Sequence, residues 1–190
     1  MPLPSFSGNG LLPPVAGASP TDQDRSPYVI SMQELVQGFG TTPRRKSLLR
    51  NLIAYRTILA GGGYQSGLQF IDGSFVEDVE ARGKEPGDID VFSLLNVPSQ
   101  YVQNPPLWQQ GGFQFWAEEV QNQPKNKARF ELDTYAILVE DFPLLGLLKN
   151  VMYWHSLFSH QRDTFAWKGF VALVLDPVQD AAALTMLGEG

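Results

Sequence analysis

The sequence predicts an α+β fold formed by one domain with an N-terminal arm. Segments with strand-like alternation or short apolar runs are separated by segments whose apolar residues recur at helical spacing. Residues 28–190 contain no internal repeat and no second change in composition, so they are expected to form a single domain. With 190 residues, 43% of them apolar, the chain is long enough to build a proper core.

The first 27 residues differ in composition from the rest of the chain. They are dense in Pro, Gly and Ser, which is typical of an extended segment without helices or strands. We expect residues 1–27 to form an arm that is either disordered or packed over the domain through its few large apolar side chains. These are Leu3, Phe6, Leu11 and Leu12.

Two helices are predicted at the start of the domain. Ser31 and Glu34 have the spacing of a capping box that opens a short helix. A longer helix is predicted over 42–61, where Thr42 can cap the helix and Pro43 suits its first position. The inner positions of this longer helix are Leu48, Leu49, Leu52, Ile53, Arg56 and Leu59.

Three more helices and four strands are predicted further along the chain. A helix is expected over 113–121, and another follows Asp176-Pro177 near the C-terminus. The helix over 144–158 is apolar on nearly every side and is therefore expected to be buried. The predicted strands are 68–73, 89–97, 128–140 and 169–175, of which the first two are expected to be neighbours.

The bulk composition limits the classes of function. The absence of cysteine removes disulfides, thiolate metal sites and a cysteine nucleophile. A formal charge of −6 and a pI near 4.8 argue against broad, non-specific nucleic-acid binding. The densest positive group lies in the helix 42–61 and is expected to be a solvated face, with contact to phosphate or RNA as the alternative. It consists of Arg44, Arg45, Lys46 and Arg50.

No membrane association is expected. The N-terminal segment lacks a basic, uninterrupted apolar leader, because prolines break it and no Lys or Arg precedes its apolar residues. The longest apolar stretch, 142–151, is too short to cross a bilayer. We therefore expect a cytoplasmic protein.

Two acidic side chains are predicted to lie together at the start of the second strand. Asp88 and Asp90 share one face of an extended chain, while Ile89 points the other way. Adjacent carboxylates repel each other, and a bound divalent cation removes that repulsion. Mg²⁺ is the favoured ion, because it takes oxygen ligands and is commonly held by one or two carboxylates together with substrate phosphates.

A third carboxylate from another strand would complete a site for two magnesium ions. Two ions about 3.5–4 Å apart form the clamp used for in-line phosphoryl displacement. Asp133 is the best candidate, because it is an acidic residue between apolar neighbours in the strand 128–140. Glu131 shares its face by the two-residue rule and is the alternative.

Gly73 and Ser74 are predicted to bind nucleotide phosphates. A glycine at the end of a strand lets a phosphate approach the backbone closely, and the Ser74 hydroxyl can hold a terminal phosphate together with adjacent amides. Lys168, with Arg162 upstream, is a further candidate for contact with a nucleotide phosphate. A solvated loop cation is the alternative for Lys168.

These residues resemble a known pattern. Gly73-Ser74, then Asp88-Ile89-Asp90, then Asp133 on a later strand are similar to the Gly-Ser, Asp-x-Asp and third acidic position of the polymerase-beta-like nucleotidyltransferase superfamily. Most of the chain is also similar to an uncharacterised bacterial nucleotidyltransferase-like family. The stretches that carry this second resemblance include LVQGFGTTPRRKSLLRNLIAYRTIL, IDGSFVEDVEARGKEPGDIDVF and YWHSLFSHQRDTFAWKGFVAL.

The resemblance implies a fold, a reaction and residue roles. The fold would be a small mixed β-sheet with helices packed on it. The reaction would be the Mg²⁺-dependent transfer of a nucleoside monophosphate from a nucleoside triphosphate, expected to be ATP. Asp88 and Asp90 would hold two Mg²⁺ ions, Asp133 would bind the catalytic ion and help activate the acceptor hydroxyl, and Ser74 would hold the leaving phosphates.

Several alternatives stay open at this point. The acceptor can be a protein, a tRNA or another RNA, or a small molecule. The main alternative to an enzyme is a catalytically inactive nucleotide-binding or interaction module on the same fold, acting in a toxin–antitoxin or phage-defence system by analogy with other small members of the superfamily. A metal-dependent phosphohydrolase using the same carboxylates is a third hypothesis.

Overall fold

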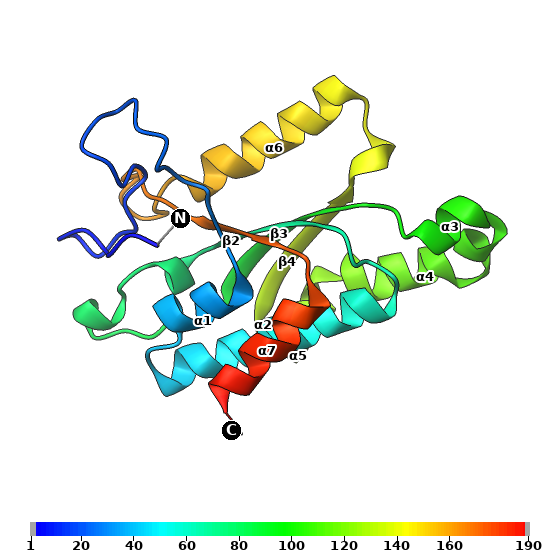
Figure 1. The fold of residues 1–190 in the computed structure, drawn as a ribbon, viewed down its shortest axis with the longest axis horizontal. Helices are drawn as coiled ribbons and strands as arrows, with labels where there is room; N and C mark the ends of the chain where they lie inside the picture. Colours follow the sequence, from blue (N-terminus) through cyan, green and yellow to red (C-terminus); the bar gives the residue numbers. More distant parts are fainter. Residues whose placement is uncertain (1–2, 189–190) are drawn as a thin grey trace.

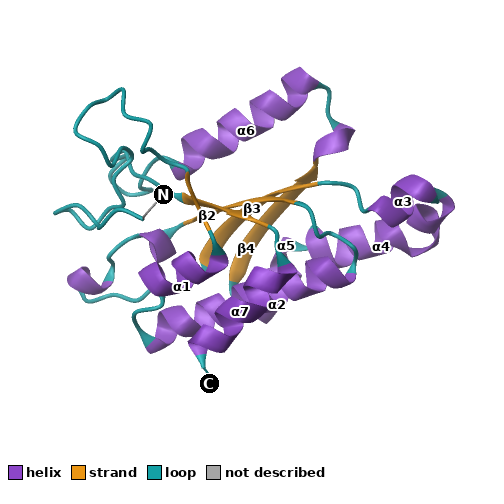
Figure 2. Ribbon diagram, viewed as in Figure 1, coloured by secondary structure: helices purple, strands orange, loops and turns teal. Residues whose placement is uncertain are grey.

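In the computed structural model, which describes residues 3–188, the chain forms one open five-stranded mixed sheet with helices on both faces (Figures 1 and 2). This arrangement confirms the predicted α+β class. The strands lie in the order β1-β5-β2-β3-β4. They are β1 (Tyr28–Ile30), β2 (Gly67–Asp72), β3 (Ile89–Leu95), β4 (Leu132–Leu138) and β5 (Val171–Val174).

The sheet contains parallel and antiparallel pairs. The central strand β2 runs antiparallel to both of its neighbours, β5 and β3, whereas the outer pairs β1–β5 and β3–β4 are parallel. The connection from β3 to β4 carries several of the helices. The helices are α1 (Met32–Phe39), α2 (Pro43–Gly61), α3 (Ser99–Gln103), α4 (Phe113–Phe115), α5 (Gln123–Phe130), α6 (Leu144–Phe158) and α7 (Pro177–Leu187).

One face of the sheet is covered by α1, α2, α5 and α7 (Figure 1); we call it the helix-covered face. The prediction for the long helix is confirmed, because Thr42 caps α2 and all six expected inner residues, Arg56 included, are buried. The Arg56 guanidinium pairs with Asp180 of α7 at 2.8 Å and donates to Gln69 of β2 at 2.8 Å. This network satisfies the one cation that the sequence pattern places among apolar residues.

Among the helices of residues 3–188, α6 covers the other face (Figure 1), and we call it the α6 face. A small cluster of buried apolar side chains lies between α6 and the strands. The expectation of a buried 144–158 helix is wrong, because only Phe158 of α6 is buried and much of its apolar surface is open to solvent. When a helix is apolar on nearly every side, its sequence does not indicate which side packs against the rest of the protein, or whether all sides do. The exposed residues include Leu144, Leu145, Leu148, Met152, Tyr153 and Leu157.

The N-terminal arm packs against the domain. Leu11 and Leu12 are buried, and Leu3 and Phe6 pack against the core from partly buried positions. Backbone hydrogen bonds tie this arm to two distant loops, from the amide of Asp78 to Gly10 and from the amide of Gly169 to Leu12. These bonds attach the arm to segments on either side of the predicted phosphate-binding turn.

The predicted strand 128–140 begins four residues later than expected, at Leu132. Residues 123–130 form α5 instead, because Asn122 caps the helix by accepting a hydrogen bond from the Lys125 amide and Pro124 lies in its first turn. The left-handed backbone of Glu131, with φ 55°, then separates helix from strand. Within residues 3–188, no helix is long and apolar enough to span a bilayer.

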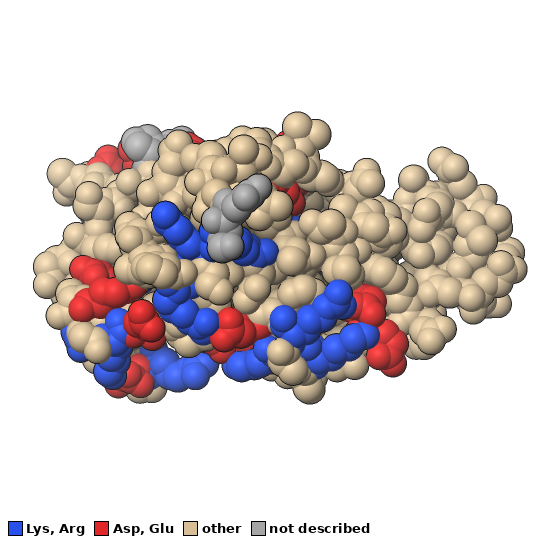
Figure 3. Space-filling model, turned by 90° about the horizontal axis from the view of Figure 1, so that it is seen from below, with Lys and Arg blue, Asp and Glu red and all other residues tan. Residues whose placement is uncertain are grey.

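Charged side chains are mixed on the helix-covered face. Seen from that side, positive and negative residues are interspersed, and the end of the molecule that holds α3 carries neither (Figure 3). The expected basic face of α2 is wrong for Arg45, which is only 2% exposed. The loop that follows β2 packs over Arg45, and its Phe75 and Glu77 carbonyls accept hydrogen bonds from the Arg45 guanidinium. Helical spacing within α2 contains no information about this loop.

Candidate active site

Three predicted carboxylates lie at one end of the α6 face. Asp90 of β3 and Asp133 of β4 are direct partners in the parallel register, so their side chains lie side by side on the same face. Asp88 immediately precedes β3 and approaches the same point, because its carboxylate shares a partner with Asp133. Two segments more than forty residues apart in sequence thus bring their acidic side chains together.

The shared partner is the ammonium of Lys127 from the last turn of α5. Lys127 Nζ lies 2.6 Å from Asp88 Oδ2 and 3.2 Å from Asp133 Oδ2. The other carboxylate oxygen of Asp133 accepts a hydrogen bond from the Gln123 side chain, also on α5. A single helix therefore supplies both a cation and an amide to the acidic residues.

Asp90 is the carboxylate of this group that Lys127 does not contact. Burial and the neighbouring charges of Asp88 and Asp133 together raise the pKa of Asp90 to about 6, against the smaller opposing effect of Arg162 and Lys127. An acidic group with an elevated pKa beside two others is the electrostatic arrangement from which a divalent cation gains most.

The Gly73-Ser74 turn lies directly beside Asp90. Gly73 follows β2 and has φ 83°, and a Cβ atom placed on it would lie 2.3 Å from Asp90 Oδ2. Glycine is therefore required here both for the backbone conformation and for the close approach. Ser74 opens a short 3₁₀ turn, Ser74–Val76, and its hydroxyl has no hydrogen-bond partner within residues 3–188.

Two buried cations hold the loop that follows this turn. Arg45 of α2 donates to the Phe75 carbonyl at 2.6 Å and the Glu77 carbonyl at 2.5 Å, and it pairs with the Glu80 carboxylate at 2.6 Å. Lys168, 2% exposed, approaches from the opposite direction. The loop is consequently fixed on both sides by charge-assisted contacts.

Lys168 contacts three acceptors of the protein itself. Its ammonium donates to the Gly73 carbonyl at 3.2 Å and to Glu77 at 3.2 Å, and it forms an ion pair with Asp72 at 3.0 Å. The alternative of a solvated loop cation is therefore wrong for Lys168, and its predicted contact with a nucleotide phosphate stays a prediction. In this arrangement Lys168 stabilises the Gly73-Ser74 turn through its hydrogen bond to the Gly73 carbonyl.

Asp72 is a fourth acidic residue that the sequence analysis did not single out. It is the antiparallel register partner of Asp90 and is 5% exposed. Burial raises the pKa of Asp72 to about 7 although the Lys168 ammonium opposes the shift. Its position in the motif, directly before Gly73 at the end of a strand, was the available signal.

The fallback ligand Glu131 lies elsewhere. It is not part of β4, and its carboxylate pairs with Arg44 at 2.9 Å and accepts from Asn51 at 3.2 Å, both on α2. The two-residue rule fails because the chain changes from helix to strand at this residue. Lys127 and Gln123 were missed because no element was predicted between the helix 113–121 and the strand 128–140, where α5 begins.

The chemistry of the donor set suits Mg²⁺, although the carboxylates do not converge on one point. Asp88, Asp90 and Asp133 offer only hard oxygen donors, and the Lys127 ammonium bridges two of them in the manner of a bound cation. Among residues 3–188, no three His, Cys, Asp or Glu side chains are arranged so as to hold a metal ion. Two of the three carboxylates are oriented toward the ammonium instead.

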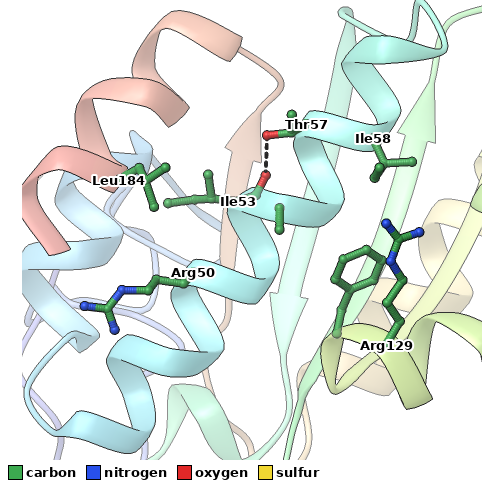
Figure 4. A pocket seen from close by; sticks show the side chains of 8 residues that line it. Arg50, Ile53, Thr57, Ile58, Arg129 and Leu184 are labelled. Carbon is green, nitrogen blue, oxygen red and sulfur yellow. Dashed lines mark hydrogen bonds between the residues drawn. The ribbon is translucent and has the colours of Figure 1, made fainter. Parts of the chain in front are cut away.

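A pocket of about 320 Å³ lies away from these residues, between α2, α5 and α7 (Figure 4). Ile53, Ile58 and Leu184 supply apolar wall, and Arg50 and Arg129 lie at its edges. The Arg129 guanidinium lies over the Phe130 ring at 4.7 Å, and Arg50 donates to the Leu187 carbonyl at 2.8 Å. This pocket belongs to the helix-covered face and contains no carboxylate of the acidic group.

Comparison with known proteins places the chain in one family. The model of a family of unknown function, DUF6932, matches residues 4–174, so the chain belongs to that family. No curated protein and no solved structure gives a significant match.

Proposed function

We propose that the protein is a Mg²⁺-dependent nucleotidyltransferase, which transfers a nucleoside monophosphate from a nucleoside triphosphate to an acceptor hydroxyl. The observation that carries the proposal is the contact between the two motifs. The Gly73 position lies against the Asp90 carboxylate, and Asp90 is the register partner of Asp133. A phosphate-binding turn and a group of carboxylates on one edge of a sheet are the parts that phosphoryl transfer requires.

Each residue would have a distinct role. Asp88 and Asp90 would hold two Mg²⁺ ions, and Asp133 would hold the ion nearest the acceptor and take the proton of its hydroxyl group. The acceptor oxygen then forms a bond to the α-phosphorus while the bond to the pyrophosphate breaks. Bound Mg²⁺ would neutralise the charge that develops on the phosphate oxygens.

The turn would position the leaving phosphates. The Ser74 hydroxyl, which has no partner among residues 3–188, is available to a phosphate, whereas the Val76 amide of the 3₁₀ turn already donates to the Gly73 carbonyl. Arg45 and Lys168 hold this turn from the inside, so the donors are fixed before substrate binds. ATP is the first candidate for the triphosphate, and protein, RNA and small molecules all stay candidates for the acceptor.

The test is label transfer from each of the four α-labelled nucleoside triphosphates into a host lysate, sorted into protein, RNA and small-molecule fractions. We expect label in one fraction with wild type and a loss of about a thousandfold or more with Asp90→Asn, because the main charge-neutralising site is removed. Asp141→Asn is the matched control, since Asp141 is an exposed carboxylate beyond the far end of β4. Equal transfer by wild type and Asp90→Asn would refute the proposal.

A second candidate function is a nucleotide-binding module that does not turn over its ligand. The observation in its favour is that Lys127 and Gln123 occupy oxygens of the carboxylates that an enzyme would use for metal. Such a module would be stabilised against heat by a nucleotide with Mg²⁺ and would transfer no label. A role in a toxin–antitoxin or phage-defence system is the corresponding biological hypothesis.

A further inference from the structure

The position of Lys127 is set by the rest of α5. Asn126, the preceding residue, is fully buried and donates to Thr134 of β4 at 2.9 Å and to the Glu119 carbonyl at 3.1 Å. The Asn122 cap fixes the start of the helix, and Glu131 ends it in a left-handed conformation. The backbone of Lys127 is therefore held firmly, while its long side chain, 45% exposed, remains free to move.

The Lys127 ammonium lies where a cation shared by Asp88 and Asp133 would lie. It is the single Lys or Arg within residues 3–188 that forms an ion pair with either of these carboxylates. Asp88 is 27% exposed and Asp133 is 18% exposed, so the three groups are open to solvent and can exchange partners. Ion pairs with this degree of exposure contribute little to folding, and a purely structural purpose explains the contact poorly.

We propose that Lys127 is an internal counter-ion that occupies the divalent-cation position of the metal-free protein, and that Mg²⁺ must displace it from Asp88 and Asp133. This inference rests on the proposed function, because it concerns the same carboxylates. An ammonium and a dehydrated divalent cation cannot share the same two oxygens, since Mg²⁺ requires its ligands at about 2.0–2.1 Å and repels a second positive charge.

The competition has a protective consequence for the metal-free chain. Without Lys127, three acidic side chains would face one another, and Arg162 would still oppose their repulsion in part. With Lys127 present this repulsion is reduced, and metal binding becomes conditional on a cation concentration high enough to release the Lys127 side chain. Lys127 thereby lowers the affinity of the site for metal.

The inference is tested with Mn²⁺ as the probe, by paramagnetic-resonance titration of the full-length, metal-free protein without nucleotide. Lys127→Met is expected to lower the dissociation constant by about tenfold or more, a size typical of residues that contact metal ligands. Lys127→Arg keeps the charge and is expected to bind Mn²⁺ much as wild type does. Lys127→Gln is a second neutral variant, and both neutral variants are checked for folding by circular dichroism.

Lys125→Met is the control for the general effect of removing one positive charge. Lys125 lies on the same helix and pairs with Glu119 at 2.7 Å, away from Asp88 and Asp133. A change as large with Lys125→Met as with Lys127→Met, or an unchanged or higher dissociation constant in both neutral Lys127 variants, would overturn the inference and leave the proposed function standing. If wild type and all variants fail to bind Mn²⁺, or if Asp88→Asn binds it as wild type does, both fail together.

Discussion

The two faces of the sheet are built on different principles. On the helix-covered face, four helices enclose most of the buried apolar side chains, and the buried cation Arg56 has a carboxylate, an amide and a carbonyl as partners. On the α6 face a small aromatic cluster packs against α6, which is largely exposed, and a group of carboxylates lies at one end of the face. The first face satisfies its charges internally, whereas the second carries an excess of negative charge.

This difference separates stability from function within one sheet. The strands supply side chains alternately to both faces, so Ile89 and Val91 pack in the core while Asp90 between them points to the site. The core residues hold the backbone, and the acidic residues can be arranged against mutual repulsion because the opposite face provides the stability to tolerate it. Substitutions on the two faces should therefore affect different measurements.

The largest effect on stability is expected at Leu52. It is fully buried in α2 on the helix-covered face, and Leu52→Ala should lower the free energy of unfolding by about 3 kcal/mol because it leaves a cavity. Urea denaturation followed by circular dichroism measures this change. A loss below about 1 kcal/mol would mean that the helix-covered face is loosely packed and that the contrast between the faces is overstated.

The next largest effect concerns the charge of Asp90. Its pKa of about 6 in the folded protein lies above the ordinary value of 3.8 for an aspartic acid side chain, so the folded state binds this proton more tightly than the unfolded state. The contribution therefore favours folding at acidic pH and is lost as the pH rises through about 6. Asp90→Asn should remove this loss and make the metal-free protein more stable than wild type by about 2 kcal/mol at pH 8.

The measurement is the free energy of unfolding from pH 4.5 to pH 8 in the presence of a chelator, for wild type, Asp90→Asn and Asp141→Asn. Only the difference between curves is used, because other groups titrate in the same range. Parallel curves for wild type and Asp90→Asn would show that the ionised Asp90 carboxylate is not destabilised by its surroundings. In that case the charges on the α6 face would be satisfied as well as those on the helix-covered face.

A substitution at Gly73 tests the contact between the Gly73-Ser74 turn and the Asp90 carboxylate. Gly73→Ala should destabilise the protein by about 2 kcal/mol, since the residue has φ 83° and the new methyl group would meet the Asp90 carboxylate. Gly83→Ala is the matched control, because Gly83 has φ 68° but open space around its Cβ position, and should cost about 1 kcal/mol. Mn²⁺ affinity should change only with Gly73→Ala, and an equal response of both variants would contradict the contact.

Much of this arrangement could be anticipated from local patterns. Helical spacing identified the inner face of α2, and short apolar runs next to polar turn residues identified β2 and β3, because these patterns report on neighbouring layers that are present. The two-residue rule placed Asp88 and Asp90 together for the same reason. Asp133 was chosen because it is an acidic residue between apolar neighbours in a predicted strand, but its position beside Asp90 depends on the register of β3 and β4, which no local pattern gives.

The failures have a common physical origin in long-range partners. Lys127 lies on α5, a helix that was not predicted because its residues 128–130 continue into the apolar alternation of the following strand. Arg45 and Lys168 are buried by acceptors supplied from the loop after β2, and nothing near either residue in the sequence signals those acceptors. The exposure of α6 was missed for a similar reason, because its own sequence does not show whether another segment of the chain covers its outer side.

The smallest effect is expected on the outer side of α6. Leu148 is 50% exposed, and Leu148→Gln keeps a good helix former while removing apolar surface, so the free energy of unfolding should change by less than about 0.5 kcal/mol. Phe158→Ala, at the buried residue of the same helix, should cost clearly more than Leu148→Gln, though less than Leu52→Ala, because it leaves a cavity beside a helix that is largely exposed. Both are measured at two protein concentrations. A larger loss for Leu148→Gln that grows with concentration would mean that another molecule of the chain covers α6 in solution, and the contrast between the two faces would then hold for the isolated monomer alone.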